Sequence, residues 1–267
     1  MLDFKGKKGI VIGVANERSL CWSITNLLLK QGANVAISCL ENTKHRIEKL
    51  LQESNQEDNA FVFKCDVSSD DEINAFYEEV KKKFGSIDFI VCAPAFTNKC
   101  NLRGKYMDIT RSDFLQTMDI SVFALTAICK TFYNIINNGS SILTLSYYGA
   151  EKIVKNYNVM GIAKSALEAS VRYLAYDLGD KMIRVNSISS GMIKTLASST
   201  IKGFNEMSKL SIKKSVLHNL LSAEDVANLA LFLLSDLSKN ITAENVHVDC
   251  GLNKIGLFLD EKEAEEE

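Results

Sequence analysis

The sequence has 267 residues, with 31 basic and 33 acidic side chains and a formal net charge of −2. This balance excludes a general attraction to nucleic acid or to an anionic membrane surface, and no apolar run reaches the roughly 20 residues that a membrane-spanning helix needs. A single proline, where average usage predicts roughly 13, excludes collagen-like and proline-rich low-complexity chains.

Short apolar runs alternate with stretches of helical periodicity along the whole chain. The apolar runs predict strands at 9–13, 33–38, 60–65, 87–92, 141–145, 182–188 and 245–248. Helices are predicted at about 19–30, 43–53, 70–84, 112–136, 157–178 and 223–234. This alternation is typical of the α/β class, here a doubly wound (Rossmann-type) parallel sheet of about seven strands with helices on both faces. Because no linker divides the chain, we expect one domain over 1–259 and a disordered acidic tail at 260–267.

Cysteine and histidine usage bears on the compartment and on metal binding. The seven cysteines include no Cys-x-x-Cys pair, which is typical of reduced thiols in a cytoplasmic protein. The three histidines, His45, His218 and His247, lie far apart in the sequence, so a local metal motif is absent. The N-terminus also lacks the apolar stretch of a signal peptide. We therefore expect a cytoplasmic protein without a metal.

The loop after the first predicted strand is a candidate phosphate-binding loop. It keeps one glycine, Gly13, where the usual Gly-x-Gly-x-x-Gly fingerprint has three. Gly13 lets the backbone approach a ligand closely, and Ser19 can cap the next helix, whose N-terminus favours a pyrophosphate. An ordinary strand-to-helix loop with a serine cap explains the same residues equally well.

Acidic residues follow the second and third predicted strands. Glu41 stands where a carboxylate commonly accepts hydrogen bonds from ribose hydroxyls, which favours NADH, although Lys44 and Arg46 follow closely. Asp66 ends the third strand, where its carboxylate either binds the adenine amino group or begins the turn before the next helix.

Two tyrosine–lysine pairs are candidates for the reaction centre. Tyr148 and Lys152 have the Tyr-x-x-x-Lys spacing of short-chain dehydrogenases, whereas Tyr157 and Lys164 are seven residues apart. Both spacings place the side chains on one helix face, and the longer one separates them by about 10.5 Å along the axis. The serine that standard members carry thirteen residues before the tyrosine is Ile135 for Tyr148, and Tyr148 follows a strand directly. We therefore favour Tyr157 and Lys164.

The segment around these tyrosines resembles bacterial NADH-dependent enoyl-acyl-carrier-protein reductases, a divergent branch of the short-chain dehydrogenase superfamily. It reads Ser-Tyr-Tyr-Gly-Ala-Glu over 146–151 and Asn-Tyr-Asn-Val-Met-Gly-Ile-Ala-Lys over 156–164. Gly13 with Ser19 and Leu20 fits that family's own loop, which also lacks the three glycines. The resemblance extends to about residue 256 and is strongest over 141–200.

The resemblance implies a reaction, its partners and the roles of three catalytic residues. Members reduce the trans-2 double bond of an enoyl thioester on acyl carrier protein with NADH, rather than NADPH, in the last step of the fatty acid elongation cycle, and are usually homotetramers. Tyr157 would donate its hydroxyl to the enolate oxygen. Lys164 would hold the nicotinamide ribose and favour the ionised phenol, and Tyr147 would line the acyl pocket.

The resemblance also implies two sets of binding residues, with no nucleic acid and no membrane as a partner. The cofactor set is Gly13, Ser19, Leu20, Leu40, Asp66, Val67, Pro94, Lys164, Ile193, Thr195, Leu196 and Ala197. The substrate set, which includes residues of a lid over the acyl chain, is Thr97, Tyr147, Tyr157, Met160, Ile201, Phe204 and Met207. Lysines that flank this lid either receive an acidic carrier or form a solvated face: Lys202, Lys209, Lys213 and Lys214.

The chain departs from the family pattern near the cofactor. Met192 stands where a proline is common, which predicts a looser lid, and Leu40 stands where glutamine is common. Ala93 replaces a serine, and Pro94, the one proline, predicts a stiffer loop after the fourth strand. A carbonyl-reducing short-chain dehydrogenase and a non-catalytic dinucleotide-binding protein remain the alternatives.

Overall fold

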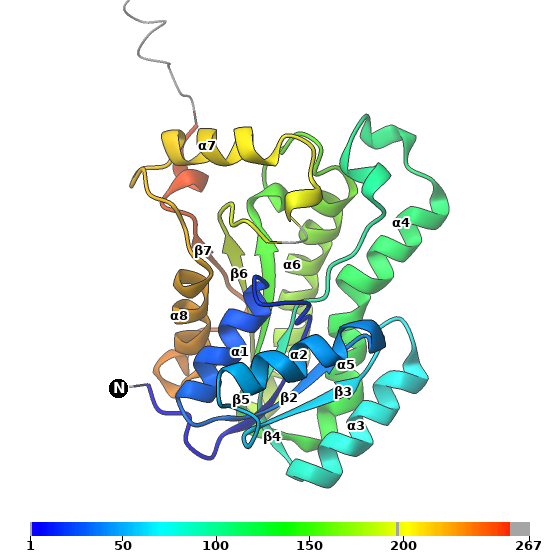
Figure 1. Ribbon diagram of the computed structural model, residues 1–267, viewed down its shortest axis with the longest axis vertical. Coiled ribbons are helices and arrows are strands. Elements are labelled where there is room, and N and C mark those ends of the chain that lie inside the picture. Colours follow the sequence, from blue (N-terminus) through cyan, green and yellow to red (C-terminus); the bar gives the residue numbers. More distant parts are fainter. Residues whose placement is uncertain (1, 196–197, 257–267) are drawn as a thin grey trace, which may run out of the picture.

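The computed structural model describes residues 2–195 and 198–256, and its centre is a sheet of seven parallel strands (Figure 1). The strand order, β3-β2-β1-β4-β5-β6-β7, reverses between β1 and β4 and confirms the predicted doubly wound α/β fold. Leu196, Ala197 and the predicted tail at 260–267 lie outside the described residues. The strands are β1 (Lys8–Ile12), β2 (Asn34–Cys39), β3 (Ala60–Lys64), β4 (Ile87–Cys92), β5 (Ile136–Tyr147), β6 (Arg184–Ser190) and β7 (Asn245–Val248).

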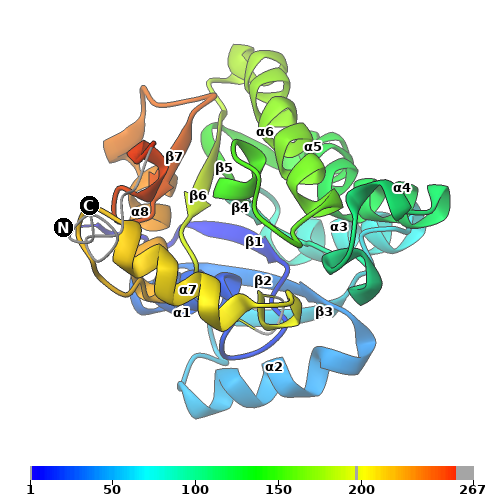
Figure 2. The ribbon, with the colours of Figure 1, turned by 90° about the horizontal axis from the view of Figure 1, so that it is seen from above.

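Helices cover both faces of the sheet, as Figure 2 shows from above. One apolar core lies between the sheet and helices α1, α2 and α8, and a second lies between the sheet and helices α3, α5 and α6. Burial on both faces explains why the strands read as continuous apolar runs. The helices are α1 (Leu20–Lys30), α2 (Glu41–Glu53), α3 (Asp70–Phe84), α4 (Arg111–Met118), α5 (Ala124–Phe132), α6 (Val159–Asp177), α7 (Phe204–Lys214) and α8 (Ala223–Leu234).

The single helix predicted over 112–136 is wrong in part. After α4 the chain forms a π-helical turn at Asp119–Phe123, and after α5 a short 3₁₀ turn leads into β5 at Ile136. Ile135 and Ile136 are both buried, so the apolar pattern continues across the helix-to-strand change without a signal. β5 runs from Ile136 to Tyr147 and is therefore longer than the predicted 141–145, and its register with β4 shifts between Ile87 and Phe89.

Helix α7 is an element that the apolar pattern did not predict. Only its first residue, Phe204, is buried, so the helix has no broad apolar stripe. It follows the loop after β6 and lies across the end of the molecule to which that strand points (Figure 1). Helix α7 therefore lies at the same end of the molecule as the carboxyl ends of the strands.

Gly13 joins the loops that follow the two central strands. Its φ angle is +109°, and a Cβ atom at this position would lie 2.8 Å from the carbonyl oxygen of Ala93 and 3.2 Å from the nitrogen of Pro94. Any larger residue would push the loop after β1 away from the loop after β4. The two loops meet where the strand order reverses, which is the usual position of a ligand crevice in this fold.

We predict that Gly13→Ala lowers the free energy of unfolding by about 2–3 kcal/mol, because a positive φ angle and a clash with backbone atoms act together. Gly104→Ala is the matched control, since Gly104 has a φ angle of +73° but open space around the Cβ position. Gly104→Ala should therefore lower the free energy of unfolding only by the cost of the backbone strain. Urea denaturation of both variants checks the difference, and equal losses would contradict the clash.

Candidate active site

Two tyrosine rings meet at the carboxyl end of β5. Tyr147 is the last residue of β5, and Tyr157 lies just before α6, which begins at Val159 rather than at the predicted 157. The ring centroids are 4.8 Å apart at an interplanar angle of 71°, which is an edge-to-face contact. Tyr148 and Lys152 do not share an α-helix, because Tyr148 begins a 3₁₀ turn that ends at Ala150. Tyr157 also lies outside α6, so the expectation that Tyr157 and Lys164 share one helix face is wrong, and the choice of Tyr157 over Tyr148 stays a prediction.

The turn after β5 fits against both rings because it contains glycine. A Cβ atom at Gly149 would lie 2.5 Å from a ring carbon of Tyr157 and 3.1 Å from the ring of Tyr147. On its other side, a Cβ atom at Gly161 of α6 would lie 2.7 Å from the carbonyl oxygen of Gly149. The turn is thus enclosed between the first turn of α6 and the two rings.

Lys164 is buried within α6. Its Nζ donates a hydrogen bond of 2.6 Å to the carbonyl oxygen of Leu145, two residues before the end of β5. Burial lowers the pKa of Lys164 to about 8, because a charged ammonium is poorly solvated there. The ammonium of Lys164 thus contacts the backbone of β5 two residues before Tyr147.

Burial also determines the protonation state of the tyrosines. It raises the pKa of Tyr147 to about 12 and raises the pKa of Tyr157 further above its usual range, with Tyr147 as the second cause. Both phenols are therefore protonated at neutral pH and can donate hydrogen bonds. Burial and Tyr147 are the causes of the raised pKa of Tyr157, and the ionising effect expected of Lys164 on this phenol stays a prediction.

An apolar cluster surrounds the tyrosines and reunites most of the predicted substrate set. Tyr157, Met160 and Ile201 are buried in it, and Tyr147 and Met207 pack against it. Two members were missed by sequence reasoning, Leu102 and Val154, which carry no motif and whose apolar character alone gives no signal.

Two residues of the predicted substrate set lie outside this cluster. Thr97 makes hydrogen bonds through its hydroxyl with Asn101 (3.1 Å) and Thr117 (2.8 Å). Phe204 is buried at the start of α7, but it is not part of the cluster around the tyrosines.

A polar cleft of about 400 Å³ opens between the loop after β1 and the segment after β6. Arg18, Arg46 and Lys194 bring three positive charges to it, a donor set that matches the negative charges of a pyrophosphate. Sequence reasoning found Thr195 but not Arg18 or Lys194, because isolated basic residues in loops have no pattern of their own. The lining residues are Asn16, Glu17, Arg18, Arg46, Lys194, Thr195 and Ser199.

The predicted cofactor residues near the first strands lie around the carboxyl edge of the sheet. The Ser19 hydroxyl accepts from the Trp22 amide at 3.2 Å and donates to the Asn16 carbonyl at 2.8 Å, so it caps α1 as predicted. Leu20 begins α1 and is partly buried. Leu40, at the N-cap of α2, is 49% exposed.

The remaining cofactor residues follow β3, β4 and β6. One carboxylate oxygen of Asp66 accepts from the amide and the hydroxyl of Ser68, so this residue does form the predicted turn. Val67 is buried in the core that α3 covers. Pro94 lies beside Gly13, and Ile193 packs against the other core.

Comparison with known proteins assigns this arrangement to a family. A sequence profile described as enoyl-(acyl carrier protein) reductase matches residues 13–253. An enoyl-[acyl-carrier-protein] reductase [NADH] of Rhizobium meliloti is 48% identical over 254 residues, which cover 94% of this chain and 92% of the relative. The chain belongs to the enoyl-acyl-carrier-protein reductase family.

Solved structures of enoyl-acyl-carrier-protein reductases agree with this assignment. The Bacillus cereus reductase, solved with NADP⁺ and an indole naphthyridinone, has a TM-score of 0.93 and 40% identity, covering 96% of this chain and all of that chain (100%). The Anaplasma phagocytophilum reductase, solved with NAD, has a TM-score of 0.90 and 45% identity, covering 95% of this chain and 96% of its own. In this reductase, no helix within the described residues is long and apolar enough to cross a membrane. The described part likewise holds no group of three or more His, Cys, Asp or Glu residues suited to a metal ion.

We predict that the burial of Lys164 makes the stability of this reductase depend on pH. The unfolded state binds more protons between pH 8, near the folded pKa, and the usual lysine value of about 10.4, so stability rises with pH in this window. The penalty for the buried charge is fully present below pH 8. The difference in unfolding free energy between Lys164→Met and the unsubstituted protein should therefore shrink by about 2 kcal/mol from pH 7 to pH 9.5.

Urea denaturation at several pH values measures this difference. Lys82→Met is the matched control, because Lys82 is exposed and its charge is hydrated in both states. A pH-independent difference for Lys164→Met would contradict the prediction.

Proposed function

We propose that this protein reduces the 2,3 double bond of a trans-2-enoyl thioester on acyl carrier protein with NADH, in the last step of the fatty acid elongation cycle. The observation that carries the proposal is the buried, protonated pair Tyr147 and Tyr157 within an apolar cluster. Such a cluster suits an acyl chain, and a protonated phenol suits the negative charge that appears on the thioester oxygen. The names of the relatives in Rhizobium meliloti and Rickettsia typhi, both NADH-dependent reductases, support the choice of cofactor.

The basic cleft fits a dinucleotide cofactor. Gly13 allows the backbone to approach a ligand where the strand order reverses between β1 and β4. The positive charges of Arg18, Arg46 and Lys194 complement a pyrophosphate. We assign the cofactor to this cleft and to the predicted residues around it. When bound, the nicotinamide supplies the hydride that the β-carbon of the substrate receives.

The side chains of this chain stabilise charge and orient the reactants. The Tyr157 hydroxyl donates a hydrogen bond to the thioester carbonyl, and the bond strengthens as the enolate forms. Tyr147 packs edge-to-face on Tyr157 and lines the acyl side of the pocket. An ammonium has three N–H donors, so the bond from Lys164 to Leu145 leaves donors for the ribose hydroxyls. Exclusion of water by the apolar cluster strengthens each of these polar interactions.

Turnover of a crotonyl thioester, followed as NADH oxidation, tests the function. We expect reduction of the crotonyl thioester, a higher rate with NADH than with NADPH, and no turnover of an acetoacetyl thioester. Turnover of the ketone alone would instead identify a carbonyl reductase. Binding of NADH without reduction of either thioester would identify a non-catalytic dinucleotide-binding protein.

We predict that Tyr157→Phe lowers kcat for the crotonyl thioester by about 10²-fold, because it removes one donor to the developing oxyanion. Affinity for NADH should stay within about twofold, since the ring and its packing are kept. Stopped-flow kinetics and fluorescence titration of NADH measure the two quantities. The matched control is Tyr133→Phe at the other end of the fold, which should keep full activity.

We also propose that the reductase is a cytoplasmic homotetramer. Apolar side chains on and beside α6 support self-association, because Ile162 is 43% exposed, Phe123 53%, Tyr173 75% and Tyr176 87%. Sedimentation velocity tests the assembly, and a monomer at micromolar concentration would contradict it.

We further propose that the lysines around α7 receive the acidic carrier protein. Lys202, Lys209 and Lys213 are exposed and Lys214 is partly buried. All four lie on or next to α7, whose Met207 packs against the apolar cluster. Complementary charge raises the association rate and makes it sensitive to salt.

We predict that Lys202→Glu combined with Lys209→Glu lowers kcat/KM for a carrier-linked enoyl substrate by about tenfold and leaves the coenzyme A analogue within twofold. The matched control is Lys30→Glu with Lys82→Glu, which makes the same charge change at the ends of α1 and α3. Equal losses on both substrates would contradict docking at α7.

A further inference from the structure

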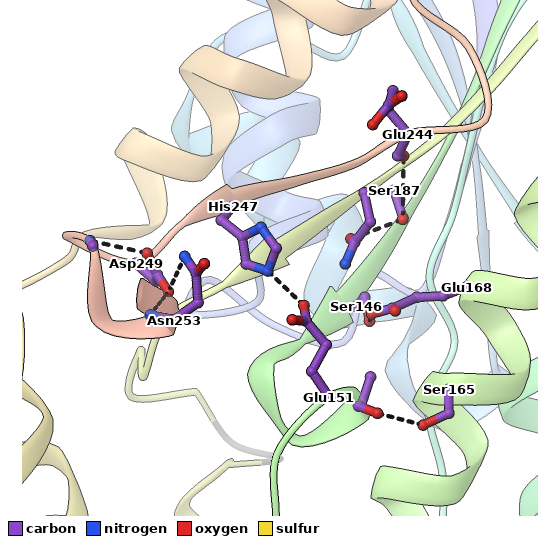
Figure 3. A network of polar contacts seen from close by, with 12 residues as sticks. Ser146, Glu151, Ser165, Glu168, Ser187, Glu244, His247, Asp249 and Asn253 are labelled. Atoms are coloured by element: carbon purple, nitrogen blue, oxygen red, sulfur yellow. Dashed lines mark hydrogen bonds and ion pairs between the residues drawn. The ribbon is translucent and has the colours of Figure 1, made fainter. Parts of the chain in front are cut away.

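A histidine of β7 contacts the turn that supports the two tyrosines (Figure 3). Nε2 of His247 donates to Oε1 of Glu151 at 2.6 Å, although the two residues are 96 positions apart in the sequence. Their side chains are 21% and 36% exposed, so the pair lies partly shielded from water. The contact joins the last strand of the sheet to the segment directly after β5.

Glu151 directly follows the short 3₁₀ turn Tyr148–Ala150 and is its C-cap residue. The turn starts at Tyr148, its Gly149 touches the Tyr157 ring, and its Ala150 carbonyl accepts a hydrogen bond of 2.6 Å from the Ser165 hydroxyl. Figure 3 shows Ser165 and His247 approaching this turn from different elements, α6 and β7. Gly149 of the turn thus contacts the Tyr157 ring, while His247 binds Glu151 at the end of the turn.

Charged groups on the neighbouring elements surround the histidine. Glu168 and Arg172 of α6 and Glu244 before β7 line the same cavity of about 310 Å³ as Glu151 and His247. Glu168 is hydrogen-bonded to Ser146, and burial raises its pKa. Because an ionised carboxylate oxygen of Glu151 can only accept, the imidazole of His247 is the donor in their contact.

We propose that His247 is a positioning residue for enoyl reduction: its bond to Glu151 fixes the turn at 148–151, so that Gly149 keeps the rings of Tyr147 and Tyr157 in their edge-to-face arrangement. This role rests on the proposed function, and His247 acts through Glu151 rather than on the substrate. The hydroxyl of Tyr157 must meet the thioester oxygen within a few tenths of an ångström, and a misplacement of about 1 Å can cost 10²-fold in rate. Without the bond from His247 to Glu151, the turn could move and displace the Tyr157 hydroxyl by such a distance.

Kinetics of three substitutions test the positioning role. We expect His247→Phe to lower kcat for the crotonyl thioester about tenfold while the Kd of NADH stays within twofold. His247→Gln, which retains a donor, should recover most of the rate. Glu151→Met, which removes the acceptor, combined with His247→Phe should be no slower than His247→Phe alone, because both changes break one contact. The matched control Glu53→Gln removes the exposed partner of Lys49 on α2 and should leave kcat unchanged.

A second measurement does not depend on turnover. The ¹³Cζ resonances of Tyr147 and Tyr157, assigned with the two tyrosine-to-phenylalanine variants, should shift in His247→Phe and return toward the original values in His247→Gln. If the unsubstituted protein does not reduce the enoyl thioester, the proposed function fails, and these resonances still decide whether His247 positions the rings.

Two results would overturn the inference. One is a fall in Tm for His247→Phe with unchanged kcat and unchanged tyrosine resonances, which would mean that the contact only stabilises the fold. The other is a double variant whose loss is the product of the two single losses. If His247→Phe does not fold, Glu151→Met, which breaks the contact, and His247→Gln, which retains a donor, decide the question by the same readouts.

Discussion

The arrangement of this protein depends on one constraint of a parallel sheet, that all strands end at the same edge. The order β3-β2-β1-β4-β5-β6-β7 brings the segments after β1, β4, β5 and β6 together there. Each strand end carries one part of the proposed site: Gly13 after β1, Pro94 after β4, the tyrosines at and after the end of β5, and Thr195 after β6. The close approach of Gly13 to Ala93 shows how little space separates them. The polar cleft and the tyrosine pair therefore both lie at the carboxyl edge of the sheet, because all its strands run in one direction.

Burial has two consequences at this edge. It stabilises the apolar cluster around the rings, and it raises the pKa values of Tyr147 and Tyr157 while it lowers that of Lys164. Both effects arise because the low-dielectric surroundings disfavour a charge. The neutral phenols suit donation to an oxyanion, whereas the lysine carries a destabilising charge below pH 8. Stability and catalytic chemistry thus have one physical cause here.

Sequence patterns located most of the elements because both faces of the sheet are buried. Apolar runs found all seven strands, and the serine at 19 marked the start of α1. The pattern failed between residues 112 and 136, where buried Ile135 and Ile136 continue it from a helix into a strand. It also missed α7, which buries only Phe204. Apolar periodicity reflects which residues are buried. It therefore gives no signal where buried residues continue from a helix into a strand, or where a helix buries almost no residue.

By itself, the sequence determined the fold class and the family resemblance, and it predicted Tyr157 and Lys164 rather than Tyr148 and Lys152 as the reactive pair. These conclusions rest on local patterns, which a linear chain displays directly. Only the tertiary structure decided that Arg18, Arg46 and Lys194 converge on one cleft and that His247 reaches Glu151. It also decided that the pKa values of the tyrosines are raised, since desolvation depends on every side chain packed around them. Contacts between residues far apart in the chain are set by the crossovers of the sheet, and no local pattern records them.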